Sequence, residues 1–140
     1  GPLSASPLPP RVLFRTYDRQ PADRFDDALA GLDPALVERL ADLGVLLVGT
    51  DSASIDPADS KTLDAHQAIR RRGLRVLENL CLDAVPEGDY ELIALPLALR
   101  DADASPVRAI QATWCSCVLA TTRRKASAAM GTSLAMAILS

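Results

Sequence analysis

The chain of 140 residues is long enough to form one domain with its own hydrophobic core. Apolar residues make up 49% of the sequence, and a mean hydropathy of +0.12 argues against a disordered chain. A net charge of −3 and an aromatic content of 4% provide neither the electrostatic nor the stacking basis for nucleic-acid binding, so we expect no nucleic-acid partner.

The cysteines do not follow the pattern of a disulfide-bonded or zinc-binding domain. Cys81 stands alone, and one residue separates Cys115 from Cys117, rather than the two of a zinc knuckle. An odd number of cysteines fits a reducing compartment, so we expect a cytoplasmic protein with ordinary thiols. The sequence contains no secretory signal and no apolar run of about 20 residues, which favours a soluble protein without a membrane partner.

The N-terminal part of the sequence has the pattern of a strand, a helix and a second strand. Residues 11–16 form the first strand candidate. After an acidic, irregular stretch, Asp33 and Pro34 predict the start of a helix that Gly44 ends. Residues 45–49 are continuously apolar, as expected of a strand covered on both faces. This order predicts a parallel strand pair joined by a right-handed crossover.

A polar loop at residues 50–60 follows that second strand at its carboxyl end, where α/β sheets usually place their ligands. Its hydroxyls and carboxylates suit the wall of a pocket and equally suit a solvated loop. Asp64 is placed to cap a short helix over residues 65–72. The arginines at positions 70–72 favour the negative end of the helix dipole, and we expect them to be a solvated helix end rather than an anion site.

His66 and Glu78 are candidate metal ligands. His66 is the only histidine in the chain and lies in the helix just described. Glu78 shares one face of a strand expected over residues 74–78 with Leu74 and Val76, and a carboxylate buried there must be paired or ligated. A helix that turns back along a strand can bring its first turn close to the strand's far end. Imidazole and carboxylate together suit zinc or a similar divalent ion, although two ligands do not complete a site.

Two more strands are expected before the character of the sequence changes. Residues 90–99 form the longest strand candidate, in which Pro96 marks an edge, a bulge or the strand's end. Residues 105–110 are a further candidate. Residues 111–140 are rich in small residues and weakly periodic, and we expect a loosely helical tail or a segment that was not selected for this fold.

Several phrases of the sequence closely resemble the C-terminal half of bacterial kynurenine formamidases (arylformamidases), of the cyclase-like metal-dependent hydrolase family. They are TDSASIDPADSKTLDAH at residues 50–66, LRVLENL at 74–80, VPEGDYELIALPLAL at 85–99 and DASPVRA at 103–109. In addition, RVLFRTY at residues 11–17 is similar to the family's central strand.

The resemblance implies an α/β protein with a swivelling β/β/α (cyclase-like) fold, here a partial domain that lacks the N-terminal part. It implies hydrolysis of N-formyl-L-kynurenine to L-kynurenine and formate in tryptophan catabolism, a homodimer, and two divalent ions, usually zinc, in the complete enzyme. In the family, the histidine of the LDAH phrase and the glutamate of the LEN phrase are ligands of the second metal. Those positions are His66 and Glu78 in this chain.

The chain departs from the family at both ends. The family's other metal ligands and its acid/base histidine belong to an N-terminal HxGTHxD-type motif, which this sequence does not contain, and a substrate-contacting aromatic residue is also missing. We expect a linker or truncation edge at residues 1–10, the C-terminal portion of the formamidase domain at residues 11–110, and a non-matching tail at residues 111–140. The resemblance assigns no catalytic residue here and leaves the substrate-binding residues unknown. We predict that the chain alone is inactive and binds zinc weakly.

Two alternative functions remain open from the sequence. A non-catalytic α/β module would use the polar loop to bind a small molecule or a partner chain without metal, and the missing motif favours it. A related cyclase-like hydrolase would act on another amide or on a lactone. The intact pair of His66 and Glu78 favours descent from the metal-dependent enzyme, and metal analysis would separate a metal-free module from a hydrolase.

Overall fold

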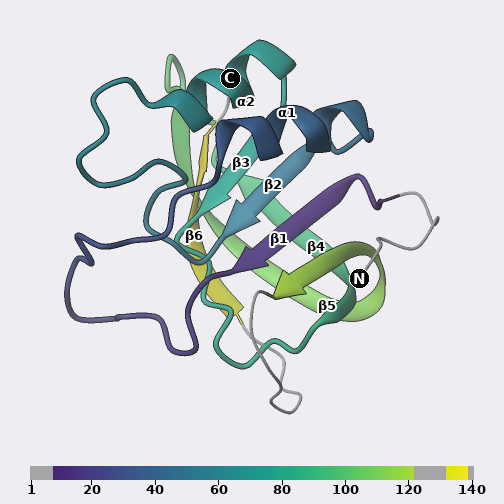
Figure 1. Ribbon diagram of the computed structural model, residues 1–140. Helices are drawn as coiled ribbons and strands as arrows, with labels where there is room; N and C mark the ends of the chain where they lie inside the picture. The colour runs from purple at the N-terminus through teal and green to yellow at the C-terminus, as the bar shows by residue number, and fades with distance from the viewer. Residues whose placement is uncertain (1–7, 122–131, 139–140) are drawn as a thin grey trace.

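The computed structural model describes residues 8–121 and 132–138, with side chains described as far as residue 112. The protein has a mixed α/β architecture of two helices and six strands in this part of the chain (Figure 1). In chain order the elements are β1 (Arg11–Arg15), α1 (Pro34–Asp42), β2 (Leu47–Thr50), α2 (Asp64–Arg72), β3 (Arg75–Glu78), β4 (Gly88–Pro96), β5 (Ala104–Thr121) and β6 (Thr132–Ile138).

The strands form one mixed sheet in the order β1-β2-β3-β6-β5-β4. The predicted parallel pairing is present, because Val12 of β1 lies opposite Val48 of β2, which in turn lies opposite Val76 of β3. β6 runs antiparallel to both β3 and β5, and β4 runs antiparallel to β5. The long strand β5 also pairs in parallel with β1, where Val12 lies opposite Val118. Strand pairing therefore runs in a closed ring from β1 to β5, and β4 lies outside this ring.

Helix α1 starts and stops where the sequence predicts. The side chain of Asp33 accepts a hydrogen bond of 2.8 Å from the amide of Ala35, and Pro34 is the first helical residue. Gly44 follows the helix with a φ of +86°, a left-handed conformation that glycine adopts at little cost. Val37 and Leu40 form the buried face of the helix.

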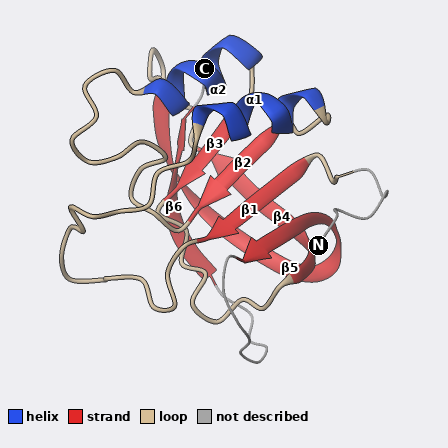
Figure 2. Cartoon of the chain, viewed as in Figure 1, coloured by secondary structure: helices blue, strands red, loops and turns tan. Residues whose placement is uncertain are grey.

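The three parallel strands are packed on both faces. On one face, Val12, Val48 and Val76 contact the buried residues of the two helices, which lie together on that side (Figure 2). On the other face, Leu13 and Leu77 belong to a second cluster that contains residues of β4 and β5. This alternation follows from the two-residue period of a strand. The double packing fixes β1, β2 and β3, and thereby the loops that leave their carboxyl ends.

The two helices are also joined on the surface by arginine–carboxylate pairs. Arg71 contacts Glu38 at 2.9 Å, and Arg72 contacts Glu38 at 2.9 Å and Asp42 at 2.6 Å. These exposed pairs agree with the interpretation of the arginine triplet as a solvated helix end. No helix among the described residues is long and apolar enough to cross a bilayer.

Two expectations about the elements were wrong. The residues beyond Gln111 that the structure describes form strands rather than a loosely helical tail, because β5 continues to Thr121 and β6 occupies Thr132–Ile138 between β3 and β5. The apolar run at residues 45–49 is not covered on both faces throughout, since Leu46 is 63% exposed and β2 begins only at Leu47. The first error arises because a weakly periodic, small-residue segment takes its conformation from its strand partners.

Candidate metal centre

The carboxyl ends of β1, β2 and β3 are joined by backbone hydrogen bonds. The amide of Asn79 donates to the carbonyl of Ser52 at 2.8 Å, and the amide of Leu80 donates to that of Thr50 at 3.0 Å. On the other side, the amide of Asp51 donates to the carbonyl of Phe14 at 3.3 Å. The segments that follow the three strands are therefore held together, although they are far apart in sequence.

His66 and Glu78 meet at this edge of the sheet. Nε2 of His66 lies 3.3 Å from Oε1 of Glu78, so the two side chains that the sequence predicted to face one another are in contact. Glu78 is buried at the end of β3, and its Oε1 also accepts a 2.8 Å hydrogen bond from the amide of Ile55 in the polar loop. The His66 side chain, in the first turn of α2, is 22% exposed. The imidazole is thus partly accessible while its carboxylate partner is not.

Asp56 completes a row of three side chains with His66 in the middle. Oδ2 of Asp56 lies 2.6 Å from Nδ1 of His66 and accepts a 3.1 Å bond from the His66 amide. Oδ1 of Asp56 accepts a 2.8 Å bond from the amide of Ala65. Asp56 therefore caps α2 from the loop, which corrects the expectation that Asp64 does so. Asp64 is the first residue of the helix, and Leu63 at the N-cap position makes no side-chain capping bond.

The two carboxylates favour the charged form of the imidazole. Hydrogen bonding to Glu78 raises the pKa of His66 from 6.5 to about 8, despite the opposing effect of burial, and hydrogen bonding to Asp56 adds to the rise. Burial acts to raise the pKa of Asp56, but hydrogen bonds from Ala65 and His66 outweigh it and lower that pKa. In the absence of metal, a protonated His66 therefore bridges two carboxylates at neutral pH.

The geometry of this pair fits part of a zinc site. Two donor atoms bound to one tetrahedral zinc ion at about 2.1 Å lie about 3.4 Å apart, close to the 3.3 Å between Nε2 of His66 and Oε1 of Glu78. A carboxylate on the other ring nitrogen, as Asp56 provides, is the usual arrangement around metal-bound histidines. Within the described residues, no group of three or more His, Cys, Asp or Glu side chains is placed to hold a metal. His66 and Glu78 can therefore supply only part of a coordination shell.

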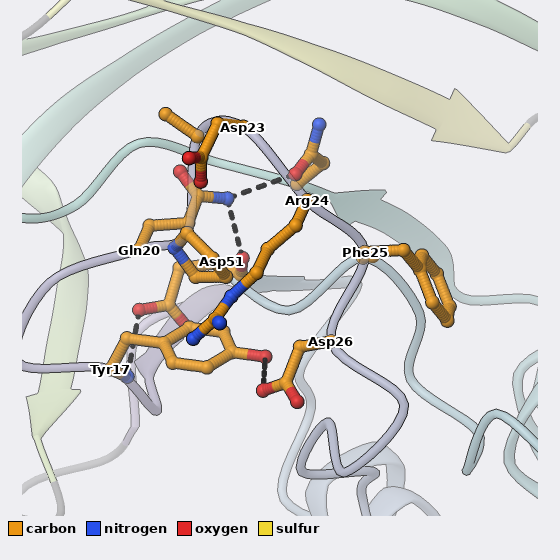
Figure 3. Close-up of a pocket in the computed structure, with 11 residues that line it drawn as sticks. Tyr17, Gln20, Asp23, Arg24, Phe25, Asp26 and Asp51 are labelled. Atoms are coloured by element: carbon orange, nitrogen blue, oxygen red, sulfur yellow. Dashed lines mark hydrogen bonds between the residues drawn. The ribbon is translucent and has the colours of Figure 1, made fainter.

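A pocket lies between the loop of residues 17–26 and the residues that follow β2 and β3. Its volume is about 380 Å³. Figure 3 shows its labelled lining residues: Tyr17, Gln20, Asp23, Arg24, Phe25, Asp26 and Asp51. Asn79, which directly follows Glu78, and Ala53 complete the lining together with Pro21 and Ala22. Part of the polar loop, at Asp51 and Ala53, is therefore a pocket wall.

Buried Asp51 fastens the pocket loop to the sheet. Its carboxylate accepts bonds from the amide and hydroxyl of Thr16 at 2.8 and 2.7 Å, and from the amide of Tyr17 at 3.1 Å. Burial raises the pKa of Asp51 even though these bonds oppose the rise. The amide group of Gln20 donates to the carbonyl of Asp51 at 2.7 Å and to the side chain of Asn79 at 2.9 Å. The loop is thus tied to the ends of both β2 and β3.

Comparison with known proteins gives one consistent result. No family model matches the chain. The kynurenine formamidase of Paracidovorax citrulli is 74% identical over 106 residues, which are 76% of this chain and 49% of that protein. The kynurenine formamidase of Delftia acidovorans is 72% identical over 103 residues, or 74% of this chain and 49% of that protein. The chain spans about half the length of the curated relatives it matches, and its resemblance to kynurenine formamidases is confirmed.

A solved structure is similar as well. It is described as a potential metal-dependent hydrolase with cyclase activity, and it matches with a TM-score of 0.54 and 31% sequence identity. The match covers 58% of this chain and 40% of that chain. The similarity in structure therefore points to the same broad class of hydrolase as the similarity in sequence.

Proposed function

We propose, from its close similarity to part of bacterial kynurenine formamidases, that this chain is part of a metal-dependent hydrolase that converts N-formyl-L-kynurenine to L-kynurenine and formate. The observation that carries the proposal is the 74% identity over 106 residues to an enzyme of that name. The contact between His66 and Glu78 is consistent with it, because it joins the two side chains that the resemblance assigns to a metal.

The fold and domain limits that we propose follow the same relatives. Helices on one face of the parallel strands and further strands on the other support a swivelling β/β/α fold. We propose that residues 11–110 correspond to the formamidase portion, with residues 1–10 and 111–140 outside it. The matched lengths of 103 to 107 residues support a portion of this size.

In the proposed site, His66 and Glu78 would hold one of two zinc ions. When bound, zinc lowers the pKa of a water molecule to about 7 and polarises the carbonyl that is to be hydrolysed. The amide of Ile55 fixes the Glu78 carboxylate, and Asp56 contacts the far side of the imidazole. The remaining ligands and the acid/base group come from a part that the relatives have and this sequence does not match. This chain alone is therefore expected to be inactive and to bind zinc weakly.

We assign the pocket of residues 17–26 to the small-molecule substrate. Its volume of about 380 Å³ falls within the range of roughly 300–1,000 Å³ that is usual for such sites. Tyr17 and Phe25 offer aromatic surface, while Arg24 and Asp26 offer charges opposite to those of an amino acid. The complete enzyme is proposed to be a cytoplasmic homodimer.

The test is a chimaera in which residues 11–110 of this chain replace the matched segment of the Paracidovorax citrulli enzyme. Formation of L-kynurenine from N-formyl-L-kynurenine is followed by absorbance with added zinc. We expect the chimaera to be active and the 140-residue chain alone to be inactive. His66→Ala should abolish activity of the chimaera, whereas Asp59→Ala, a control in the polar loop, should not. A folded chimaera without formamidase activity would overturn the proposed substrate.

A second candidate is a related hydrolase that acts on another amide or on a lactone. The solved structure described as having cyclase activity is the observation in its favour. The same chimaera, active on such a substrate and inactive on N-formyl-L-kynurenine, would select it. The non-catalytic module is not favoured, because the most similar relatives described above are named as enzymes.

A further inference from the structure

We propose that Asp56 is a positioning residue of the candidate metal centre, which holds the neutral His66 ring in the tautomer with its proton on Nδ1. The lone pair of Nε2 then faces Glu78 and would be free to bind a metal ion. This inference rests on the proposed roles of His66 and Glu78, and it adds a residue that neither the sequence pattern nor the relatives' names assign.

The Asp56 carboxylate is itself held in place. The backbone amides of Ala65 and His66 donate to its two oxygens, at 2.8 Å to Oδ1 and 3.1 Å to Oδ2. The residue is 2% exposed, so water does not compete for its oxygens. An ionised carboxylate can only accept hydrogen bonds, and the imidazole atom 2.6 Å from Oδ2 must therefore carry a proton.

The contact on the opposite side of the ring is longer, although Glu78 contributes more than Asp56 to the raised pKa of the charged ring. Nε2 lies 3.3 Å from Oε1 of Glu78, at the long limit for a hydrogen bond, and Oε1 already accepts the amide of Ile55. Once the ring has lost one proton, the remaining proton is held better by Asp56 than by Glu78. A histidine held in this way presents a free Nε2, which is the form that ligates metal.

The substitution Asp56→Asn changes the group that faces the imidazole and keeps one of the two bonds by which Asp56 caps α2, since only the His66 amide loses its acceptor. Asparagine keeps a side-chain oxygen that can accept the Ala65 amide, but its NH₂ group would then face Nδ1 of His66. A ring nitrogen that accepts from NH₂ carries no proton, so the neutral ring is forced to carry its proton on Nε2, where it blocks a metal. The matched control is Asp33→Asn, the same change at a carboxylate that caps α1 through a 2.8 Å bond to Ala35.

Because His66 is the only histidine of the chain, nuclear magnetic resonance reports its tautomer without overlap. In long-range ¹H–¹⁵N spectra of the zinc-free 140-residue chain at pH 9.5, we expect the proton on Nδ1 in the wild type and in Asp33→Asn. We expect it on Nε2 in Asp56→Asn. Zinc affinity, measured by competition with a chelator, should fall about 10- to 100-fold in Asp56→Asn and stay within twofold of the wild type in Asp33→Asn.

A wild-type ring with its proton on Nε2 would overturn the role of Asp56, and that measurement needs no variant to fold. Full zinc affinity in a folded Asp56→Asn would overturn it too. If His66→Ala binds zinc as tightly as the wild type, the proposed metal site fails instead. In that case the wild-type tautomer still decides whether Asp56 orients the ring. Failure of the metal site can therefore be distinguished from failure of the role of Asp56.

Discussion

At the scale of single residues, the candidate site depends on contacts between positions that no sequence spacing connects. His66 and Glu78 could be found because the chain has one histidine and because a carboxylate in line with core residues is costly to bury. Asp56 was only one of several polar residues in its loop, and nothing in the sequence indicated that it contacts His66. The contacts of Asp51 could not be predicted from the sequence either, since its partners Thr16 and Tyr17 lie at the end of another strand.

Glu78→Gln is expected to lower the zinc affinity of the chain by at least about tenfold, because a neutral amide is a much poorer ligand than a carboxylate. The glutamine oxygen can still accept the Ile55 amide, so the fold should be kept. Chelator competition gives the affinity, and Glu38→Gln, a change on the exposed face of α1, is the control. Equal zinc affinity in Glu78→Gln and wild type would remove Glu78 from the set of ligands.

The raised pKa of His66 predicts opposite effects of pH on stability and on zinc binding. The folded-state pKa of about 8 exceeds the ordinary value of 6.5, so the protonated ring stabilises the fold below pH 6.5, and this stabilisation is lost as pH rises through about 8. The urea midpoint of the zinc-free chain should therefore fall between pH 6.5 and 9. Zinc affinity should rise over the same interval, because the metal needs the deprotonated ring.

His66→Gln is the control for this pH dependence. It keeps a polar side chain at the position but cannot gain the proton, so its urea midpoint should change less between pH 6.5 and 9 than that of the wild type. Equal changes in the two proteins would assign the pH dependence to other groups.

At the scale of elements, sequence signals were sufficient where they were local and insufficient where they depended on distant partners. Helix α1 has its cap, its proline and its glycine within its own sequence, and its limits were predicted. Helix α2 is capped by a residue eight positions before it, so its true cap was missed. β5 and β6 have weak local patterns, and their strand conformation follows from pairing with β1, β3 and one another.

Leu63 at the start of α2 is a site of backbone strain. Its φ of +52° and ψ of +52° are left-handed, a conformation that costs a non-glycine residue roughly 1 kcal/mol. The side chain is 46% exposed, so its removal loses little packing. Leu63→Gly is therefore expected to increase the free energy of unfolding by up to about 1 kcal/mol in urea titration.

Leu43, at the C-cap of α1, provides the comparison. It is similarly exposed, at 49%, but its φ is −84°, an ordinary value for a leucine. Leu43→Gly should be neutral or destabilising. If both glycine variants change stability in the same direction and by the same amount, strain at Leu63 is not a significant factor.

At the scale of the whole molecule, the order of strands and helices was predictable as an α/β arrangement with parallel pairing at its centre. The position of β6 between β3 and β5 was not predictable, because the local sequence of a strand does not show which strands it pairs with. The resulting sheet leaves β4 with β5 as its sole strand partner among the described residues. Exposed apolar side chains form a row at alternate positions of this edge strand, at Ile93 and Leu95, and the row continues beyond the strand's end to Leu97 and Leu99.

We expect this row to promote association of the chain with a second copy of itself, because an unpaired strand edge with apolar side chains is a template for pairing. Sedimentation velocity should show a mass that increases with concentration. Leu95→Lys, at the most exposed position of the row (76%), should shift the chain towards monomer. Leu46→Lys, a change at a 63% exposed leucine outside the row, should not. A wild-type chain that stays monomeric at all concentrations would contradict this expectation.

The pairing of Val12 with Val118 also affects how the protein matures on the ribosome. Among the described residues, β1 pairs with β2 and β5, and the part of β5 that contains Val118 is translated much later than β1. Contacts between such distant positions form slowly, since the entropy cost of closing a long loop comes before the contacts can stabilise the fold. During synthesis, the side of β1 that pairs with β5 therefore stays unpaired until β5 has emerged.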